Sequence, residues 1–63
     1  MNLLKVLKDA GDDFRADGVE VDDGIAYEVA NGLLDDPEVL AAAKKMWPGK
    51  SKQILQEIMA DRI

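Results

Sequence analysis

The chain has 63 residues and a formal net charge of −5, and it contains neither cysteine nor histidine. Disulfides are excluded, and so is a zinc site built from Cys and His ligands. A chain this short buries only about 60% of the surface that its unfolded form exposes. We therefore expect one domain over residues 1–63, stabilised by tight packing, by self-association or by a partner.

The first helical pattern lies at the start of the chain. Leu3, Leu7, Ala10 and Phe14 recur at the spacing of one helix face. Gly18 is a suitable residue to end this helix. Residues 19–24 alternate too briefly for a strand and are predicted to form a loop.

The second pattern, over residues 25–34, is the clearest in the chain. We expect Asp22 or Asp23 to cap this helix, because both come just before its first apolar residue. Asn31-Gly32 is typical of a hairpin, but the flanking periodicity is helical, so Gly32 is expected to permit close approach of another helix. The stripe consists of Ile25, Ala26, Val29, Ala30, Leu33 and Leu34.

Two further helices are predicted after residue 36. Asp36 suits the N-cap of the third helix and Pro37 its first position, and Pro48 should stop that helix at Trp47. Pro48-Gly49 turns the chain into a fourth helix, whose apolar residues include Ile54 and Ile58.

These patterns favour an all-α fold, a small bundle or orthogonal array of three to four short helices. The alternative is a longer hairpin of the second and third helices, used for dimerisation. The core is predicted to contain Leu4, Leu7, Phe14, Ile25, Val29, Leu33, Leu40, Ala43, Ile54, Ile58 and Met59.

Catalytic chemistry is not expected. Without His or Cys, the chain lacks the commonest general base and the best nucleophile. Ser51 is the only hydroxyl besides Tyr27, and paired acids such as Asp35 and Asp36 are explained by caps and surface. We expect no cofactor and no small-molecule substrate.

A calcium site fails at two ligand positions. Residues 13–18 place Asp at loop positions one and five and Gly at six, as in an EF-hand. Position three would be Arg15, and position twelve would be Gly24 where a glutamate is required. An irregular site that uses Asp17, Asp22 and Asp23 is left open.

Basic residues near the C-terminal end suggest an anion site. Residues 48–51 echo the end of a phosphate-binding loop, but position 44 is Lys where the motif needs Gly, so an NTPase is rejected. Lys50, Ser51 and Lys52 at a helix start could still bind an anion. Nucleic-acid binding is disfavoured, because the pI is about 4.4.

The middle of the chain is strongly acidic. Residues 9–38 carry eleven acids against Arg15. This charge can select partners, and it could mimic the phosphates of a nucleic acid on a protein that handles nucleic acids. Asp12, Asp13, Asp22 and Asp23 are the candidate acidic surface.

The function we expect is protein–protein interaction, as an adaptor, assembly or inhibitory factor that binds another protein or itself. Apolar residues beyond one small core motivate this expectation, since they could form a second face. No apolar run approaches the ~20 residues of a membrane span, and a cytoplasmic location is expected. The candidate partner-binding residues are Leu34, Val39, Trp47, Leu55 and Ile63, with Leu3 on the same face.

Overall fold

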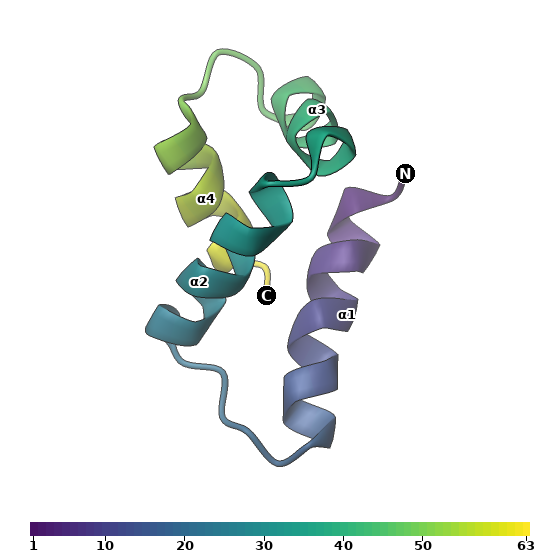
Figure 1. Ribbon diagram of the computed structural model, residues 1–63, viewed down its shortest axis with the longest axis vertical. Helices are drawn as coiled ribbons and strands as arrows, with labels where there is room; N and C mark the ends of the chain where they lie inside the picture. Colours follow the sequence, from purple (N-terminus) through teal and green to yellow (C-terminus); the bar gives the residue numbers. More distant parts are fainter.

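A computed structural model describes all 63 residues and contains four α-helices and no strand (Figure 1). Helix α1 spans Leu3–Ala16, α2 Asp23–Leu34, α3 Pro37–Met46 and α4 Lys52–Ala60. The predicted all-α fold of short helices is confirmed. None of the helices combines the length and the apolar character that crossing a bilayer requires.

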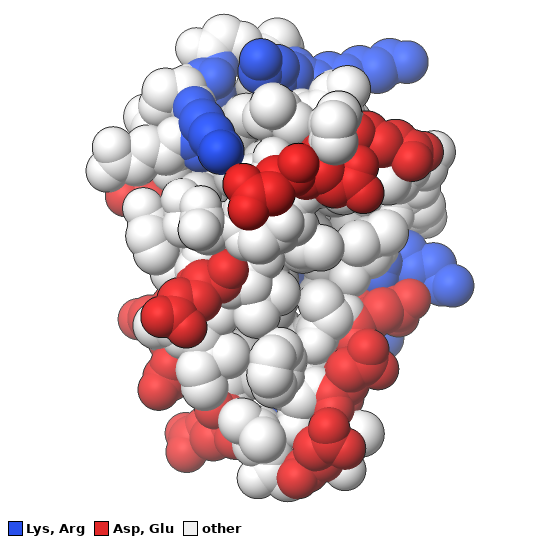
Figure 2. Space-filling view, in the orientation of Figure 1, with Lys and Arg blue, Asp and Glu red and all other residues white.

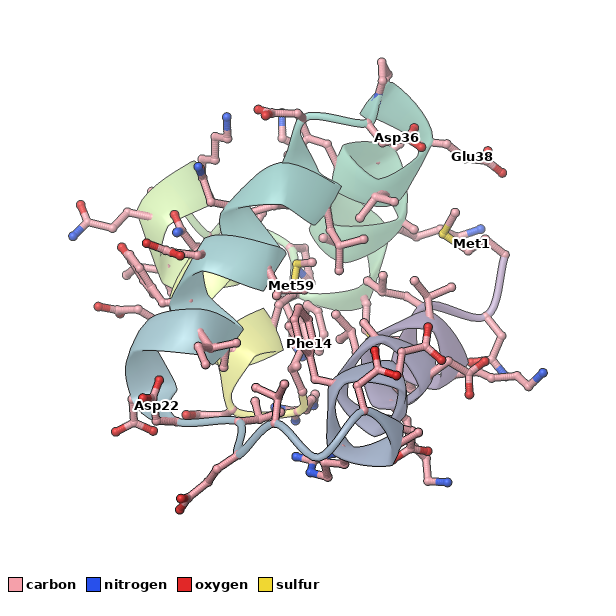
Figure 3. All side chains as sticks on the ribbon, turned by 60° about the horizontal axis from the view of Figure 1, so that its bottom comes forward. Met1, Phe14, Asp22, Asp36, Glu38 and Met59 are labelled. Atoms are coloured by element: carbon pink, nitrogen blue, oxygen red, sulfur yellow. The ribbon has the colours of Figure 1, made fainter.

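The helix starts follow from local hydrogen bonds of capping side chains. Asp22 accepts the backbone N–H of Ile25 at 2.8 Å, and Asp36 accepts that of Glu38 at 2.9 Å. Both caps stand at the first turns of their helices in Figure 3. Asn2 and Ser51 cap α1 and α4 in the same way. Each cap satisfies one of the donors that a helix start leaves unpaired.

Helix α1 ends at Ala16, and Gly18 just beyond it terminates the helix as predicted. Gly18 has a φ of 79°, a conformation that glycine adopts without steric cost. The amides of Gly18 and Val19 donate to the carbonyls of Arg15 and Phe14, both at 3.0 Å. This is the Schellman pattern, which satisfies two of the last carbonyls of the helix.

Helices α2 and α4 run antiparallel side by side, α3 covers one end of the molecule, and α1 lies on the other side (Figure 1). Met59 is fully buried and points into the space between the α2–α4 pair and α1 (Figure 3). The core consists of Leu3, Leu7, Ala26, Ala30, Leu34, Val39, Ala43, Leu55, Met59 and Ile63.

The predicted core is correct for Leu7, Ala43 and Met59. It is wrong for Leu4 and Ile54, which are 46% and 44% exposed. The error is one position of phase, because the adjacent residue is buried in each case. On α2 the buried residues are Ala26, Ala30 and Leu34, and the other aliphatic residues of this helix are only partly buried. Val29, Leu33 and Leu40 are partly buried beside the core, and Phe14, Ile25 and Ile58 are half-buried.

The predicted second apolar face does not exist on the surface. The residues predicted to form this face are instead buried in the core of the same chain. Leu3, Leu34, Val39, Leu55 and Ile63 are all between 0% and 7% exposed. Trp47 is half-buried against the core, and the guanidinium of Arg62 lies 5.2 Å from the centre of its ring.

A tight seam joins α1 to the end of the chain. Gly11 is buried, and a Cβ there would collide with the carbonyl of Ile63. Arg15 donates a hydrogen bond to the Ile63 carbonyl oxygen at 2.8 Å. We call the contact of Gly11 and Arg15 with Ile63 the seam. The sequence predicts that another helix approaches Gly32 closely. This prediction is wrong, because Gly32 is exposed and open space surrounds it.

Candidate functional site

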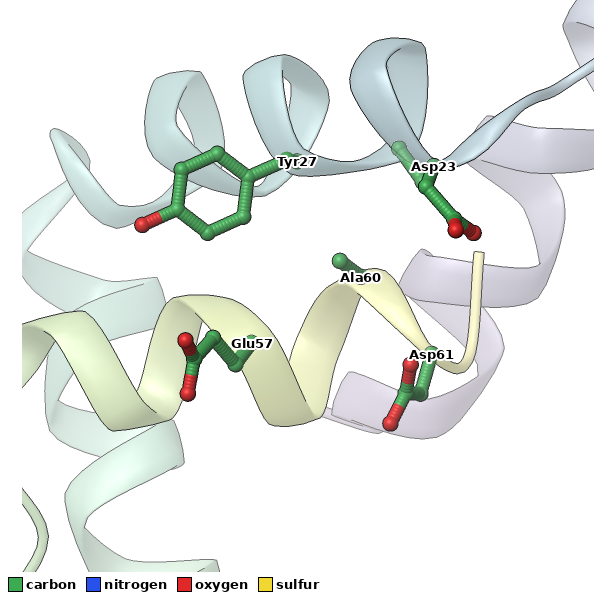
Figure 4. Close-up of a pocket in the computed structure, with 6 residues that line it drawn as sticks. Asp23, Tyr27, Glu57, Ala60 and Asp61 are labelled. Carbon is green, nitrogen blue, oxygen red and sulfur yellow. The ribbon is translucent and has the colours of Figure 1, made fainter.

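A groove opens between the start of α2 and the end of α4, with a volume of about 380 Å³. The antiparallel arrangement brings these two helix ends together. Ala26 and Ala60 are too small to fill the space between the helices, and the longer side chains stand around it (Figure 4). We call this hollow the acidic groove, and its lining residues are Asp23, Ala26, Tyr27, Glu57, Ala60 and Asp61.

The carboxylates of the groove have no partner within the chain. Asp23, Glu57 and Asp61 are exposed, accept no side-chain hydrogen bond and form no ion pair. Other acids do find cations. Lys8 lies 3.4 Å from Asp12, for example. The groove therefore has no cationic side chain paired with its acids, although Asp23 lies in the first turn of α2, where the positive end of the helix favours an acid.

Helix α4 adds to this charge. Asp61 caps the C-terminal end of α4, Glu57 lies one turn before it, and the last turn contains no basic residue. The carbonyl end of a helix carries a partial negative charge, so acids there are unfavourable by roughly 0.3–1 kcal/mol each at an exposed position. Arg62, which follows Asp61, already offsets part of this repulsion, because its Nη1 donates to the backbone carbonyl of Ile58 at 3.3 Å. A cationic ligand would offset more of it.

A buried amide fixes the two sides of the groove. Gln56 is 9% exposed, and its Nε2 donates to the backbone carbonyl of Tyr27 at 2.9 Å. This bond ties α4 to the turn of α2 that carries the Tyr27 ring. With α4 held in this register, the Tyr27 ring lies at the edge of the groove, and Tyr27 is 37% exposed.

The chemistry that the groove offers is recognition of cations. Carboxylates accept charge-assisted hydrogen bonds from ammonium and guanidinium groups, and an aromatic face attracts the same cations. No group of three or more acids in the molecule is arranged to hold a metal ion, and this includes the set of Asp17, Asp22 and Asp23 left open above.

The four acids predicted as one surface are all exposed but have different roles. Asp12 pairs with Lys8 and Arg15, and Asp22 caps α2. Asp13 borders a separate hollow on α1, beside Phe14. Only Asp23 belongs to the acidic groove. Figure 2 shows the carboxylates spread over much of the visible face.

The three residues of the predicted anion site also have different partners. The hydroxyl oxygen of Ser51 accepts the amide of Ile54 at 3.3 Å as the cap of α4. Lys52 lies 3.8 Å from Asp35, whereas Lys50 is exposed and unpaired. Two of the three residues therefore already have partners within the chain, and anion binding here stays a prediction.

Sequence reasoning missed Tyr27, Glu57 and Asp61. A signal was present, because Asp23 and Tyr27 share one helix face and Glu57 and Asp61 share another. These two faces form one groove only because α2 and α4 pack antiparallel. The sequence alone does not show that contact.

Comparison of the chain with protein-family models, with curated proteins and with solved structures finds no match.

Proposed function

We propose that the protein acts by binding another protein, and that the acidic groove receives lysine or arginine side chains of that partner. The observation that carries the proposal is the open groove whose three carboxylates have no partner within the chain. An adaptor or inhibitory role with no chemical step agrees with this, because the groove offers charge and an aromatic ring. The absence of cysteine supports a reducing compartment, so we place the interaction in the cytoplasm.

A second candidate is mimicry of a nucleic acid. Asp12, Asp13, Asp22 and Asp23 are all exposed, and this supports a broad acidic surface that occupies the basic groove of a protein that handles nucleic acids. This candidate needs the acids of α1 as well as the acidic groove, which makes the two proposals separable.

The test is capture of partners by the tagged protein from lysate of its source cells, at low and high salt. A variant with Asp23→Asn and Tyr27→Ala alters the groove alone. Its matched control, Asp13→Asn with Leu4→Ala, removes one exposed carboxylate and one exposed apolar side chain from α1.

We expect a salt-sensitive partner that the groove variant loses by about tenfold or more and that the control retains. Loss in both variants, with competition by DNA, would favour mimicry. Capture that persists in the groove variant would contradict the proposed site.

A further inference from the structure

Helix α1 has few interactions with the rest of the molecule. All of its ion pairs join residues of the helix itself, Lys5 with Asp9 and Asp12 with both Lys8 and Arg15. Its N-terminal cap and its Schellman end also use only residues next to it in the chain. These interactions stabilise α1 as a helix but do not hold it against the other helices.

The other three helices are joined to one another. Helices α2 and α4 pack side by side, and only residues 35–36 separate α2 from α3 (Figure 1). The Gln56 side chain of α4 donates to the Tyr27 carbonyl of α2 at 2.9 Å. Lys52 of α4 lies 3.8 Å from Asp35, which follows α2. We call α2, α3 and α4 together the three-helix unit.

The contact of α1 with the three-helix unit is narrow. The buried residues of α1 are Leu3, Leu7 and Gly11, which are four positions apart and so form a single stripe. One hydrogen bond crosses from this helix to a distant part of the chain, and it joins Arg15 to the Ile63 carbonyl at 2.8 Å. A short apolar stripe and one polar contact therefore hold α1 in place.

We propose that α1 is a lid, which opens from the three-helix unit while that unit stays folded. Residues 17–22 are its hinge, since all of them except Val21 are exposed. The hydrogen bond between Arg15 and Ile63 is its clasp. Opening uncovers Met59, which in the closed state is fully buried between α1 and the α2–α4 pair (Figure 3).

Opening of α1 alone costs less free energy than unfolding of the whole chain. Segments with few buried apolar contacts open more easily than the core elements of a protein. A helix of 14 residues is itself marginal in water, so an open α1 loses the protection of its backbone amides. The lid is independent of the proposed function, because the residues that line the acidic groove lie on α2, on α4 and at the end of α4.

Native-state hydrogen exchange, followed by nuclear magnetic resonance at low urea concentrations, tests the lid. We expect amides in the middle of α1 to have protection factors about tenfold or more below those of α2 and α4. Their exchange should also depend less on urea, since opening of one helix exposes less surface than global unfolding.

Two variants separate the lid from the three-helix unit. Ser51→Ala removes the cap of α4 and should lower protection in α2 and α4 about threefold or more, while α1 keeps its wild-type protection. Arg15→Leu keeps helix propensity but removes the clasp, and it should lower protection in α1 about threefold to tenfold. Lys8→Leu is its matched control. It also removes a cation paired with Asp12 but breaks no contact outside α1, so protection in α1 should change by less than about twofold.

Oxidation of methionine measures the uncovering of Met59 directly. Hydrogen peroxide converts accessible methionine to its sulfoxide, and Met46, which is 43% exposed, serves as the internal reference. Arg15→Leu should accelerate oxidation of Met59 by the same factor by which it lowers protection in α1. Ser51→Ala should leave the rate at Met59 unchanged.

Equal protection and equal urea dependence in all four helices would overturn the lid, because the chain would then open only as a whole. The same conclusion would follow if Ser51→Ala lowered protection in α1 in parallel with α2, or accelerated oxidation of Met59. An Arg15→Leu variant that behaves like Lys8→Leu would show that the hydrogen bond to Ile63 is not the clasp.

Discussion

The end of α4 meets its two neighbours in opposite ways. Toward α1 it closes into the seam, where the backbone of Ile63 lies against Gly11 with no room for a side chain. Toward α2 it opens into the acidic groove, where alanines leave space and unpaired carboxylates border it. The difference teaches that one short segment can pack tightly against one neighbour and leave an open, acidic hollow against the other. Changes in the seam or the core should therefore reduce stability, whereas changes in the groove should reduce binding.

The largest effect is expected from the core beneath both regions. Met59 is fully buried where α1 faces the α2–α4 pair, so Met59→Ala leaves a cavity that nearby side chains fill only in part. We expect a loss of about 2–5 kcal/mol in the free energy of unfolding. Urea denaturation followed by circular dichroism measures it. A loss below about 1 kcal/mol would show that α1 is not firmly packed on Met59.

The seam should respond next. Gly11→Ala places a Cβ against the carbonyl of Ile63, so α1 and the last residue must separate. We expect a net loss of about 1–3 kcal/mol, typical of overpacking, despite the better helix propensity of alanine. The same denaturation experiment applies.

Gly32→Ala is the matched control for the seam. Gly32 is a helical glycine in open space, so alanine there should raise stability by up to about 1 kcal/mol. Opposite signs for the two substitutions would verify the close contact at Gly11. Equal gains would mean that the seam yields without cost.

The smallest stability effect is expected in the groove. Asp61→Asn removes a negative charge from the carbonyl end of α4 and should stabilise the protein by about 0.3–1 kcal/mol. The same change should weaken capture of a basic partner. Denaturation and capture should thus move in opposite directions, and a variant that is both less stable and unaffected in capture would contradict the separation of roles.

Much of the fold can be predicted from local chemistry. Groups within a few residues of one another predict the cap at Asp36, a cap at Asp22 or Asp23, the glycine stop at Gly18 and the helix end before Pro48. These features need no knowledge of the tertiary structure.

Tertiary features are harder to predict, and the two glycines show why. The sequence predicts the close helix contact at Gly32, yet in the structure the close contact is at Gly11. The partner of that contact is Ile63, which is 52 positions away in the sequence. The phase error of the core has a similar origin, because the buried face of α1 or α4 depends on which helices pack against it. Leu3 and Leu55 are buried there, whereas Leu4 and Ile54 are exposed.

The site is predictable only in kind. An excess of negative charge follows from composition, and Asp23 is among the acids that the sequence singles out. Glu57 and Asp61 lie within residues 39–63, whose net charge is positive. Their place in the acidic groove is therefore evident only when α4 is packed against α2.

The most direct test of the acidic groove is a nuclear magnetic resonance titration of the labelled protein with a short peptide of lysines and arginines. Amide shifts concentrated at Asp23, Tyr27, Glu57, Ala60 and Asp61, and abolished by high salt, are the predicted result. Shifts spread equally over the acids of α1, or absent altogether, would show that the groove is not a recognition site.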